Sequence, residues 1–230
     1  MSLQLLETHQ EPKIYLTHAT DFKDFMKQLL EQTIHFFADW LEVSDTGKGH
    51  LEPLMTEMKR CTAANSFTPQ LTETAEKWLP VAFAEDAPDH CQPLLNQLQA
   101  DYQALRWLPH PNQKIEPDFK SKFTVCQLIG PAHNSVFTSD KIEVGFSIQA
   151  PEAFYPPHFH PAAEFYGILT GLSEWQIYYN RPMFHPPGAH IFHPSEAPHA
   201  MMTHDDPLLT IWAWCGDLGP ATEIPANGWL

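Results

Sequence analysis

One short stretch of the chain constrains its fold more than any other. Within residues 155–171, His158 and His160 are separated by a single residue. Glu164 follows four residues after the second histidine, and Gly171 follows seven residues after Glu164. Side chains alternate between the two faces of a strand, so His158 and His160 are expected to point the same way. The stretch therefore predicts strands that bring two imidazoles and a carboxylate together.

These side chains have the chemistry of a metal site. Histidine nitrogens with a carboxylate suit a borderline divalent transition metal: Zn, Fe, Mn, Co or Ni. The best candidate for a fourth ligand is His199, which follows an Ala-Pro pair. Seven of the 14 histidines lie between residues 158 and 204, a density that favours a metal over scattered surface placement. The predicted ligands are His158, His160, Glu164 and His199 of one divalent ion.

This pattern resembles the first motif of the cupin superfamily. In that motif, His-x-His is followed after three residues by Glu and after six more by Gly. Residues 158–171 match it without a gap. The second cupin motif runs from a Pro-Gly turn to a late histidine, and residues 187–199 fit it loosely. The resemblance implies a cupin barrel, a double-stranded β-helix or jelly roll. His190 and His193 are additional histidines that the pattern does not require.

Composition narrows the classes of partner. The net charge is −15, with 28 acidic and 13 basic residues, so a nucleic-acid backbone or an anionic membrane is an improbable partner. The four cysteines are scattered without a Cys-x-x-Cys pair, and the first residues lack the basic and apolar regions of a signal peptide. We expect reduced thiols, a cytoplasmic location and no membrane span.

Hydrophobic periodicity divides the chain into a mainly helical region, residues 1–115, and a strand-rich region, residues 116–230. The resemblance implies that the second region is the cupin β-barrel with the metal site. The first 20 residues carry little pattern and predict an arm or edge segment. Apolar residues then recur at three- and four-residue steps, which is typical of amphipathic helices that pack on a core. Four helices are expected, at residues 21–41, 51–64, 70–83 and 91–107.

Beyond residue 115, short β-rich runs alternate with Gly, Pro and Asn turns. Many short strands of this kind favour a closed antiparallel barrel or jelly roll that can hold one small ligand. We expect residues 172–179 to pair with residues 164–169 as a hairpin across a Thr-Gly turn. The expected strands are residues 123–129, 141–149, 164–169, 172–179, 189–192, 199–203 and 208–215.

A narrower resemblance involves two tyrosines. Tyr155 precedes His158 by three residues, and Tyr166 follows Glu164 by two, so Tyr166 shares the face of Glu164 by strand parity. Together with a late Pro-His and a Trp-rich strand, this pattern over roughly residues 120–220 resembles the cupin-type dimethylsulfoniopropionate (DMSP) lyases. A helical N-terminal part resembles a longer branch of that group. The resemblance implies cleavage of DMSP to dimethyl sulfide and acrylate, with Tyr166 as general base.

The chemistry of such a β-elimination agrees with these residues. Removing a proton beside a carboxylate builds negative charge on a group that is already anionic, and a bound divalent ion offsets that charge. The ordinary tyrosine pKa is about 10, and a nearby cation favours the phenolate that Tyr166 needs to act as base. Tyr155 is expected to hydrogen-bond the substrate carboxylate or a metal-bound water.

The sulfonium end of the substrate needs aromatic faces, which attract cations without an ion pair. Trp212 and Trp214 alternate along one strand, so both face one side. The family resemblance suggests a pocket position for Trp214. The expected substrate pocket is formed by Trp214, Trp212, Tyr178 and Phe192.

Two other functions remain open at this point. An Fe(II) cupin dioxygenase would use similar ligands and would depend on oxygen. A non-catalytic metal-containing cupin would bind ligand without turnover. A cupin sugar isomerase is a weaker alternative, because no evident Lys or Arg is placed to hold a phosphate. Since cupin barrels commonly pair, we expect a homodimer.

Overall fold

The structure is a computed structural model that describes residues 19–62, 65–112 and 115–229. The predicted N-terminal arm lies outside these residues, apart from its last two positions, which begin the first helix. No helix in the described part of the chain is long and apolar enough to cross a membrane.

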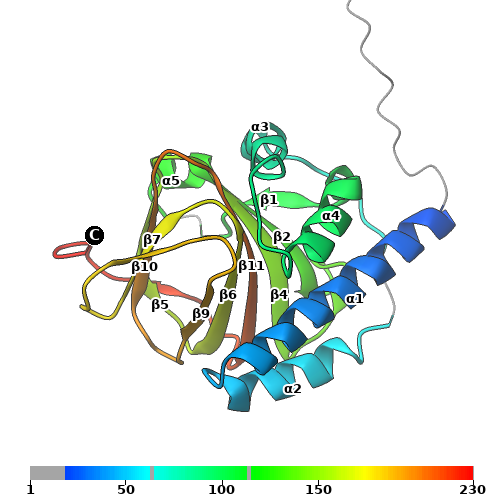
Figure 1. Cartoon of the computed structure of the whole chain (residues 1–230), viewed down its shortest axis with the longest axis horizontal. Helices are drawn as coiled ribbons and strands as arrows, with labels where there is room; N and C mark the ends of the chain where they lie inside the picture. Colours follow the sequence, from blue (N-terminus) through cyan, green and yellow to red (C-terminus); the bar gives the residue numbers. More distant parts are fainter. Residues whose placement is uncertain (1–18, 63–64, 113–114, 230) are drawn as a thin grey trace, which may run out of the picture.

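Four helices precede the main β region, and a fifth lies within it (Figure 1). They are α1 (Ala19–Val43), α2 (Lys48–Met58), α3 (Glu73–Ala82), α4 (Gln92–Asp101) and α5 (Pro117–Lys122), with a 3₁₀ turn at Tyr102–Ala104. The strands are β1 (Trp107–Pro109), β2 (Phe123–Gly130), β3 (Phe137–Thr138), β4 (Ile142–Gln149), β5 (Phe154–Phe159), β6 (Ala162–Thr170), β7 (Ser173–Ile177), β8 (Met183–His185), β9 (His190–His193), β10 (His199–Thr203), β11 (Leu208–Gly216) and β12 (Thr222–Glu223).

The strands form two sheets. The larger has the order β1-β2-β4-β11-β6-β9, with the short β3 parallel to β2, and the smaller has the order β12-β5-β10-β7-β8. All other pairs are antiparallel. From β4 onward the chain passes back and forth between the two sheets, with β4, β6, β9 and β11 in the larger and β5, β7, β8, β10 and β12 in the smaller. The predicted cupin-type β fold with a helical N-terminal part is confirmed.

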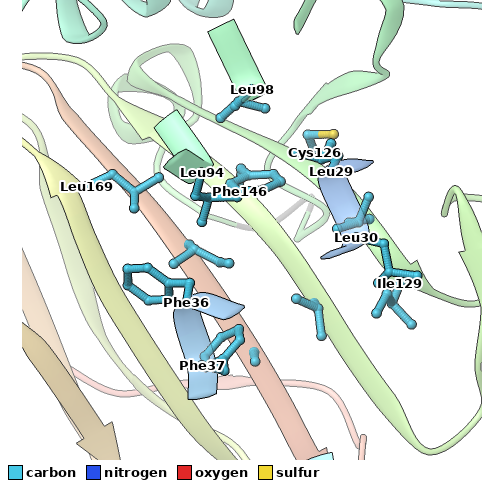
Figure 2. Packing of buried hydrophobic residues seen from close by; sticks show 14 of the residues in the cluster. Leu29, Leu30, Phe36, Phe37, Leu94, Leu98, Cys126, Ile129, Phe146 and Leu169 are labelled. Atoms are coloured by element: carbon cyan, nitrogen blue, oxygen red, sulfur yellow. The ribbon is translucent and has the colours of Figure 1, made fainter. Parts of the chain in front are cut away.

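Helices α1 to α4 pack against the outer face of the larger sheet, whereas Phe119 of α5 belongs to the cluster inside the barrel (Figure 1). Figure 2 shows this packing, with Leu29 and Phe36 of α1 and Leu94 of α4 lying over Phe146 and Leu169 of the sheet. Gly167 of β6 makes room for α1, because a Cβ there would lie 2.3 Å from the ring of Phe36. Helices and sheet therefore share a single hydrophobic core, and removing the helices would expose it.

A second hydrophobic cluster fills the inside of the barrel. On β6, Phe165 and Leu169 face the helices, whereas Tyr166 and Ile168 belong to the interior cluster. The same alternation places Trp212 of β11 inside. Because side chains alternate along a strand, one set packs on the helices and the other set points into the interior of the barrel.

The predicted hairpin between residues 164–169 and 172–179 is wrong. Strand β7 pairs with β10 and β8 in the smaller sheet, whereas β6 pairs with β11 and β9 in the larger sheet. Gly171, between them, has φ +88°, and a Cβ there would lie 2.2 Å from the carbonyl oxygen of Pro207. The Thr-Gly turn therefore carries the chain from one sheet to the other.

Helix ends also differ from the predictions. Helix α2 begins at Lys48 and ends at Met58, so Pro53 lies in its second turn and removes only the hydrogen bond to the carbonyl of Gly49. The predicted fourth helix ends at Asp101, and Trp107 instead begins β1, which pairs with β2 of the larger sheet. A strand of the barrel therefore precedes the predicted domain boundary at residue 115.

Candidate metal centre

The four side chains predicted as ligands converge inside the barrel from both sheets. His158 lies on β5 and His199 on β10, and the two are register partners. His160 directly follows β5, and Glu164 lies on β6 of the facing sheet. All four are buried, with at most 3% of any side chain exposed. The two sheets thus bring polar groups together in a place that excludes water.

The three histidines are held in the same tautomer. In each, Nδ1 lies at hydrogen-bonding distance from a backbone carbonyl two residues away, and a carbonyl only accepts, so Nδ1 carries the hydrogen. The neutral ring then presents the Nε2 lone pair to the cavity, which is how metal-binding histidines are usually oriented. The pairs are His158 with Pro156 at 2.9 Å, His160 with Ala162 at 3.0 Å and His199 with Ala197 at 2.9 Å.

Glu164 lies at the centre of this group. Its Oε2 is 3.2 Å from Nε2 of His160 and 3.2 Å from Nε2 of His199. A lone pair that faces a carboxylate oxygen is repelled unless a proton or a cation lies between them. A divalent ion would serve both histidines and the carboxylate at once. The ligand atoms of His158, His160 and His199 all lie within 4.8 Å of one another, so the residues present fit a metal ion.

The pKa shifts of the buried groups also indicate that positive charge is favoured next to Glu164. Burial raises the pKa of Glu164. When protons occupy the histidine nitrogens that face the carboxylate, the positive charge of His160 and the hydrogen bonds from His160, His193 and His199 outweigh burial and hold the pKa well below its usual range. Burial lowers the pKa of His160, but the Glu164 carboxylate outweighs it, so the pKa is raised. Burial and the charge of His199 lower the pKa of His158, which is therefore a neutral imidazole.

His193 also belongs to this group, and its role was left open by the sequence. It is fully buried on β9, opposite Glu164 in the register, and its Nδ1 lies 2.9 Å from Glu164 Oε2. Together with Glu164 and His199 it forms a second set of groups that could hold a metal ion. Its pKa is lowered to about 4, mainly by burial. The sequence could have placed His193 inside the barrel, because it lies two residues after Ile191 on the same strand and alternate residues share a face. Ile191 belongs to the interior cluster.

Trp214 contacts Glu164 directly. Its indole Nε1 donates to Glu164 Oε1 at 2.5 Å, and its ring lies 4.1 Å from that of His160, centroid to centroid. Trp212 lies beside it, with ring centroids 6.1 Å apart, in the interior cluster. The two tryptophans predicted to line the pocket therefore lie on the inner side of the barrel, and Trp214 also donates a hydrogen bond to Glu164.

Tyr166 is buried beside Glu164. It lies on the inner face of β6, and its ring packs edge-on against Trp175 at 4.8 Å. Burial raises the pKa of the phenol above its ordinary value, and the negative charge of Glu164 raises it further. The phenol is therefore protonated when Glu164 faces it without a compensating cation.

Tyr155 lies on the opposite sheet, in contact with His158. Their rings stack at 4.2 Å, and the other stacking partner of Tyr155 is Phe119 at 4.4 Å. Its hydroxyl oxygen is 2.7 Å from Nε2 of His110. Burial, followed by the charge of Glu164, raises the pKa of Tyr155. His110 had no ligand spacing in the sequence, and only the fold brings it here.

Two residues predicted for the pocket lie elsewhere. Phe192 faces outward from β9 and packs on Phe165 at 4.9 Å, because parity sends its neighbours Ile191 and His193 inward. Tyr178 is 45% exposed in the turn after β7, where its φ is +55°. Neither side chain belongs to the interior cluster.

Comparison with known proteins identifies the family. A model of the dimethylsulfoniopropionate lyase family matches residues 54–210, more than half of the chain. Dimethylsulfoniopropionate lyase DddQ of Ruegeria pomeroyi is 33% identical over 165 residues, which cover 70% of this chain and 81% of that protein.

Solved structures agree with the fold. The crystal structure of DMSP lyase DddQ from Ruegeria pomeroyi has a TM-score of 0.63 at 24% identity and covers 89% of this chain and 98% of its own. A chain from the crystal structures of the DMSP lyases RdDddP and RnDddQII has a TM-score of 0.65 at 23% identity and covers 88% of this chain and 99% of its own. From the sequence match and the shared fold, the chain belongs to the dimethylsulfoniopropionate lyase family.

Proposed function

We propose that this protein is a metal-dependent lyase that cleaves DMSP to dimethyl sulfide and acrylate by base-initiated β-elimination. The observation that carries the proposal is the contact between a buried phenol, Tyr166, and a buried carboxylate, Glu164, around which histidine lone pairs converge. Family membership supplies the substrate class. The site supplies a base, a cation-binding group and buried aromatic surroundings.

The ligands in this proposal are His158, His160, Glu164 and His199, and His193 is close enough to replace or support one of them. When bound, a divalent ion would supply positive charge that offsets the charge developing on the substrate carboxylate and favours the Tyr166 phenolate. Nitrogen and carboxylate ligands suit Zn, Fe, Mn, Co or Ni.

The chain's own groups carry the proton and position the substrate. Tyr166, as phenolate, accepts the proton from the carbon next to the carboxylate. The electron pair of that C–H bond forms the double bond of acrylate, and the carbon–sulfur bond breaks with its electrons leaving on neutral dimethyl sulfide. Tyr155 is placed to donate a hydrogen bond to the substrate carboxylate. Tyr166 returns its proton to solvent after product release.

The aromatic interior suits the sulfonium group. Trp212 and Trp214 present rings to the cavity, and each cation–π contact contributes about 0.5–2 kcal/mol. An aromatic face attracts the cation without an ion pair, so it does not hold back the leaving group. The net charge of −15 is compatible with a zwitterionic substrate and disfavours nucleic acid.

We place the protein in the cytoplasm as a homodimer. The four cysteines are free, as expected in a reducing compartment. Analytical ultracentrifugation of the metal-loaded protein tests the dimer.

The decisive experiment gives purified, metal-loaded protein DMSP and measures dimethyl sulfide in the headspace and acrylate in solution. We expect equal amounts of both products, lost after chelation and restored by adding the metal. The same assay without oxygen separates this function from an Fe(II) dioxygenase, because elimination consumes no oxidant. Absence of both products from metal-replete protein would overturn the proposal.

A further inference from the structure

A histidine outside the metal centre lies at hydrogen-bonding distance from the hydroxyl group of Tyr155. His110 directly follows β1, whose pairing with β2 fixes its position: Pro109 is the register partner of Thr124. His110 is 8% exposed, and its Nε2 lies 2.7 Å from the Tyr155 hydroxyl oxygen. The contact joins residues 45 positions apart, so it depends on the folded barrel.

The direction of this hydrogen bond follows from the other nitrogen of His110. The backbone N–H of Asn112 donates to His110 Nδ1 at 3.2 Å, and a backbone N–H can only donate. Nδ1 therefore carries no hydrogen, and the hydrogen of the ring lies on Nε2. Burial, together with the charge of Lys120, lowers the pKa of His110 to about 4, which is consistent with a neutral ring at neutral pH.

It follows that Nε2–H of His110 donates to Tyr155. The hydroxyl oxygen of Tyr155 accepts this bond, so its own hydrogen is directed elsewhere. The ring of Tyr155 is also fixed, because it stacks on Phe119 with an interplanar angle of 23° and on His158 with an angle of 19°. With the ring plane and one lone pair occupied, the phenolic hydrogen has few remaining orientations.

The turn that carries His110 is anchored beside the metal centre. The side-chain amide of Asn112 donates a hydrogen bond to the carboxylate of Glu223 on β12. Glu223 is in turn the register partner of His158 on β5. The state of Nδ1 is thus set by Asn112, which is tied to Glu223 of β12, and the partner of Nε2 is Tyr155 of β5.

We propose that His110 is a positioning residue that fixes the Tyr155 hydroxyl as a hydrogen-bond donor into the cavity, for the carboxylate of the substrate. The proposal rests on the proposed lyase function for the identity of that carboxylate. The tautomer of His110 and its action through Tyr155 rest on the geometry alone. A donor that is already oriented loses no conformational freedom when substrate binds. A fixed N–H or O–H dipole also binds an anionic group more strongly than a neutral one, so the donor favours the carboxylate end of a zwitterion.

The first test is independent of turnover. Zinc-loaded protein labelled with ¹⁵N-histidine is studied by long-range proton–nitrogen NMR, and the His110 signals are assigned by their loss in His110→Gln. We expect Nε2 to be protonated and Nδ1 to be unprotonated at pH 7. A hydrogen on Nδ1, or on both nitrogens, would overturn the proposal whatever the activity.

The second test is a double-mutant cycle on the lyase reaction. His110→Leu removes the donor at similar volume, and losing one hydrogen bond predicts a loss of about tenfold in kcat/KM. His110→Gln keeps an N–H group near the position of Nε2 and is expected to retain most of the activity. In a Tyr155→Phe background, His110→Leu should cause less than about a twofold further loss, because the two residues act as one unit.

Metal content and thermal midpoint are measured for each variant, and metal content should stay unchanged because no ligand is altered. A full tenfold loss in the Tyr155→Phe background would overturn the proposal, since His110 would then act without Tyr155. Equal losses in His110→Gln and His110→Leu would also overturn it. A wild-type protein that forms neither product would instead overturn the lyase function, and the NMR result would still decide the His110 tautomer.

Discussion

The indole nitrogen of Trp214 lies 2.5 Å from Oε1 of Glu164, while Nδ1 of His193 lies 2.9 Å from Oε2 of the same carboxylate. Two donors from different strands, β11 and β9, therefore fix both oxygens of Glu164, the carboxylate that we propose as a metal ligand. Groups that orient a metal ligand in this way typically contribute a factor of about 10–100 to metal affinity.

Replacing Trp214 by Phe tests this contact, because Phe keeps an aromatic ring and removes the donor. We expect the metal dissociation constant to rise by about tenfold or more. Competition with a chromophoric chelator measures it. The matched control is Trp212→Phe, on the same face of β11, which should leave metal affinity within about twofold. Equal effects of the two substitutions would show that ring size, and not the N–H group, determines affinity.

Tyr166→Phe tests the general base. General-base catalysis contributes about 10²–10⁴-fold, so dimethyl sulfide formation should fall by at least about 100-fold. Metal content, measured by elemental analysis, should remain that of the wild type because Phe preserves the packing on Trp175. A variant that keeps more than about a tenth of wild-type turnover would exclude this phenol as the base.

His160→Ala tests the ligand set. Removing one imidazole leaves Glu164 with a buried charge that has lost a partner, so metal and activity should be lost together. The control is His133→Ala, an exposed histidine distant in sequence, which should retain both. Full metal occupancy in the His160 variant would contradict the assignment.

Gly171→Ala tests whether the turn that carries the chain from β6 to β7 requires glycine. A positive φ and a close backbone oxygen both oppose a Cβ, so we expect a loss of about 1–3 kcal/mol in the free energy of unfolding. Gly49→Ala is the matched control: it lies in α2 with no atom within 4 Å of the added Cβ. Because Ala favours helix, that variant should be unchanged or more stable by up to about 1 kcal/mol. Urea unfolding at constant metal concentration measures both.

Stability should fall in mild acid, with contributions from the buried His110 and the partly buried His190. Burial lowers the folded-state pKa of His110 and of His190 from 6.5 to about 4, with smaller contributions from the charges of Lys120 and His90 respectively. Between these values the unfolded chain binds protons that the folded chain does not, so stability decreases as pH falls from 6.5 towards 4. Each group contributes up to about 1.4 kcal/mol per pH unit. Urea midpoints at pH 7 and pH 5 check this, and His110→Gln should show a shallower decrease.

Much of the centre could be predicted from the sequence, because it depends on local spacing. Parity alone places Glu164 and Tyr166 on one face of β6. The same rule, applied to β9, also explains why Phe192 is outside the site. Once the strand is known to place Ile191 inside, His193 must follow it inward and Phe192 must face the helices.

The features that the sequence did not predict depend on contacts between distant segments. The Thr-Gly turn before β7 has the composition of a hairpin, but β6 and β7 pair with strands of different sheets, and Gly171 packs against the distant Pro207. The hydrogen bond between His110 and Tyr155 depends on where β1 joins the larger sheet. The observed ends of α2 and α4 differ from the predicted ends by several residues. Helix propensity is a weak guide to these ends, because packing against the rest of the fold overrides it.

Strand β6 has nine residues, and every one of them is buried. One side of the strand carries Glu164 and Tyr166, and the other side receives Phe36 of α1 at Gly167. The strand therefore has no position at which a substitution is confined to the molecular surface. Neutral drift should accordingly be slowest here, and when β6 does change, α1 should change with it.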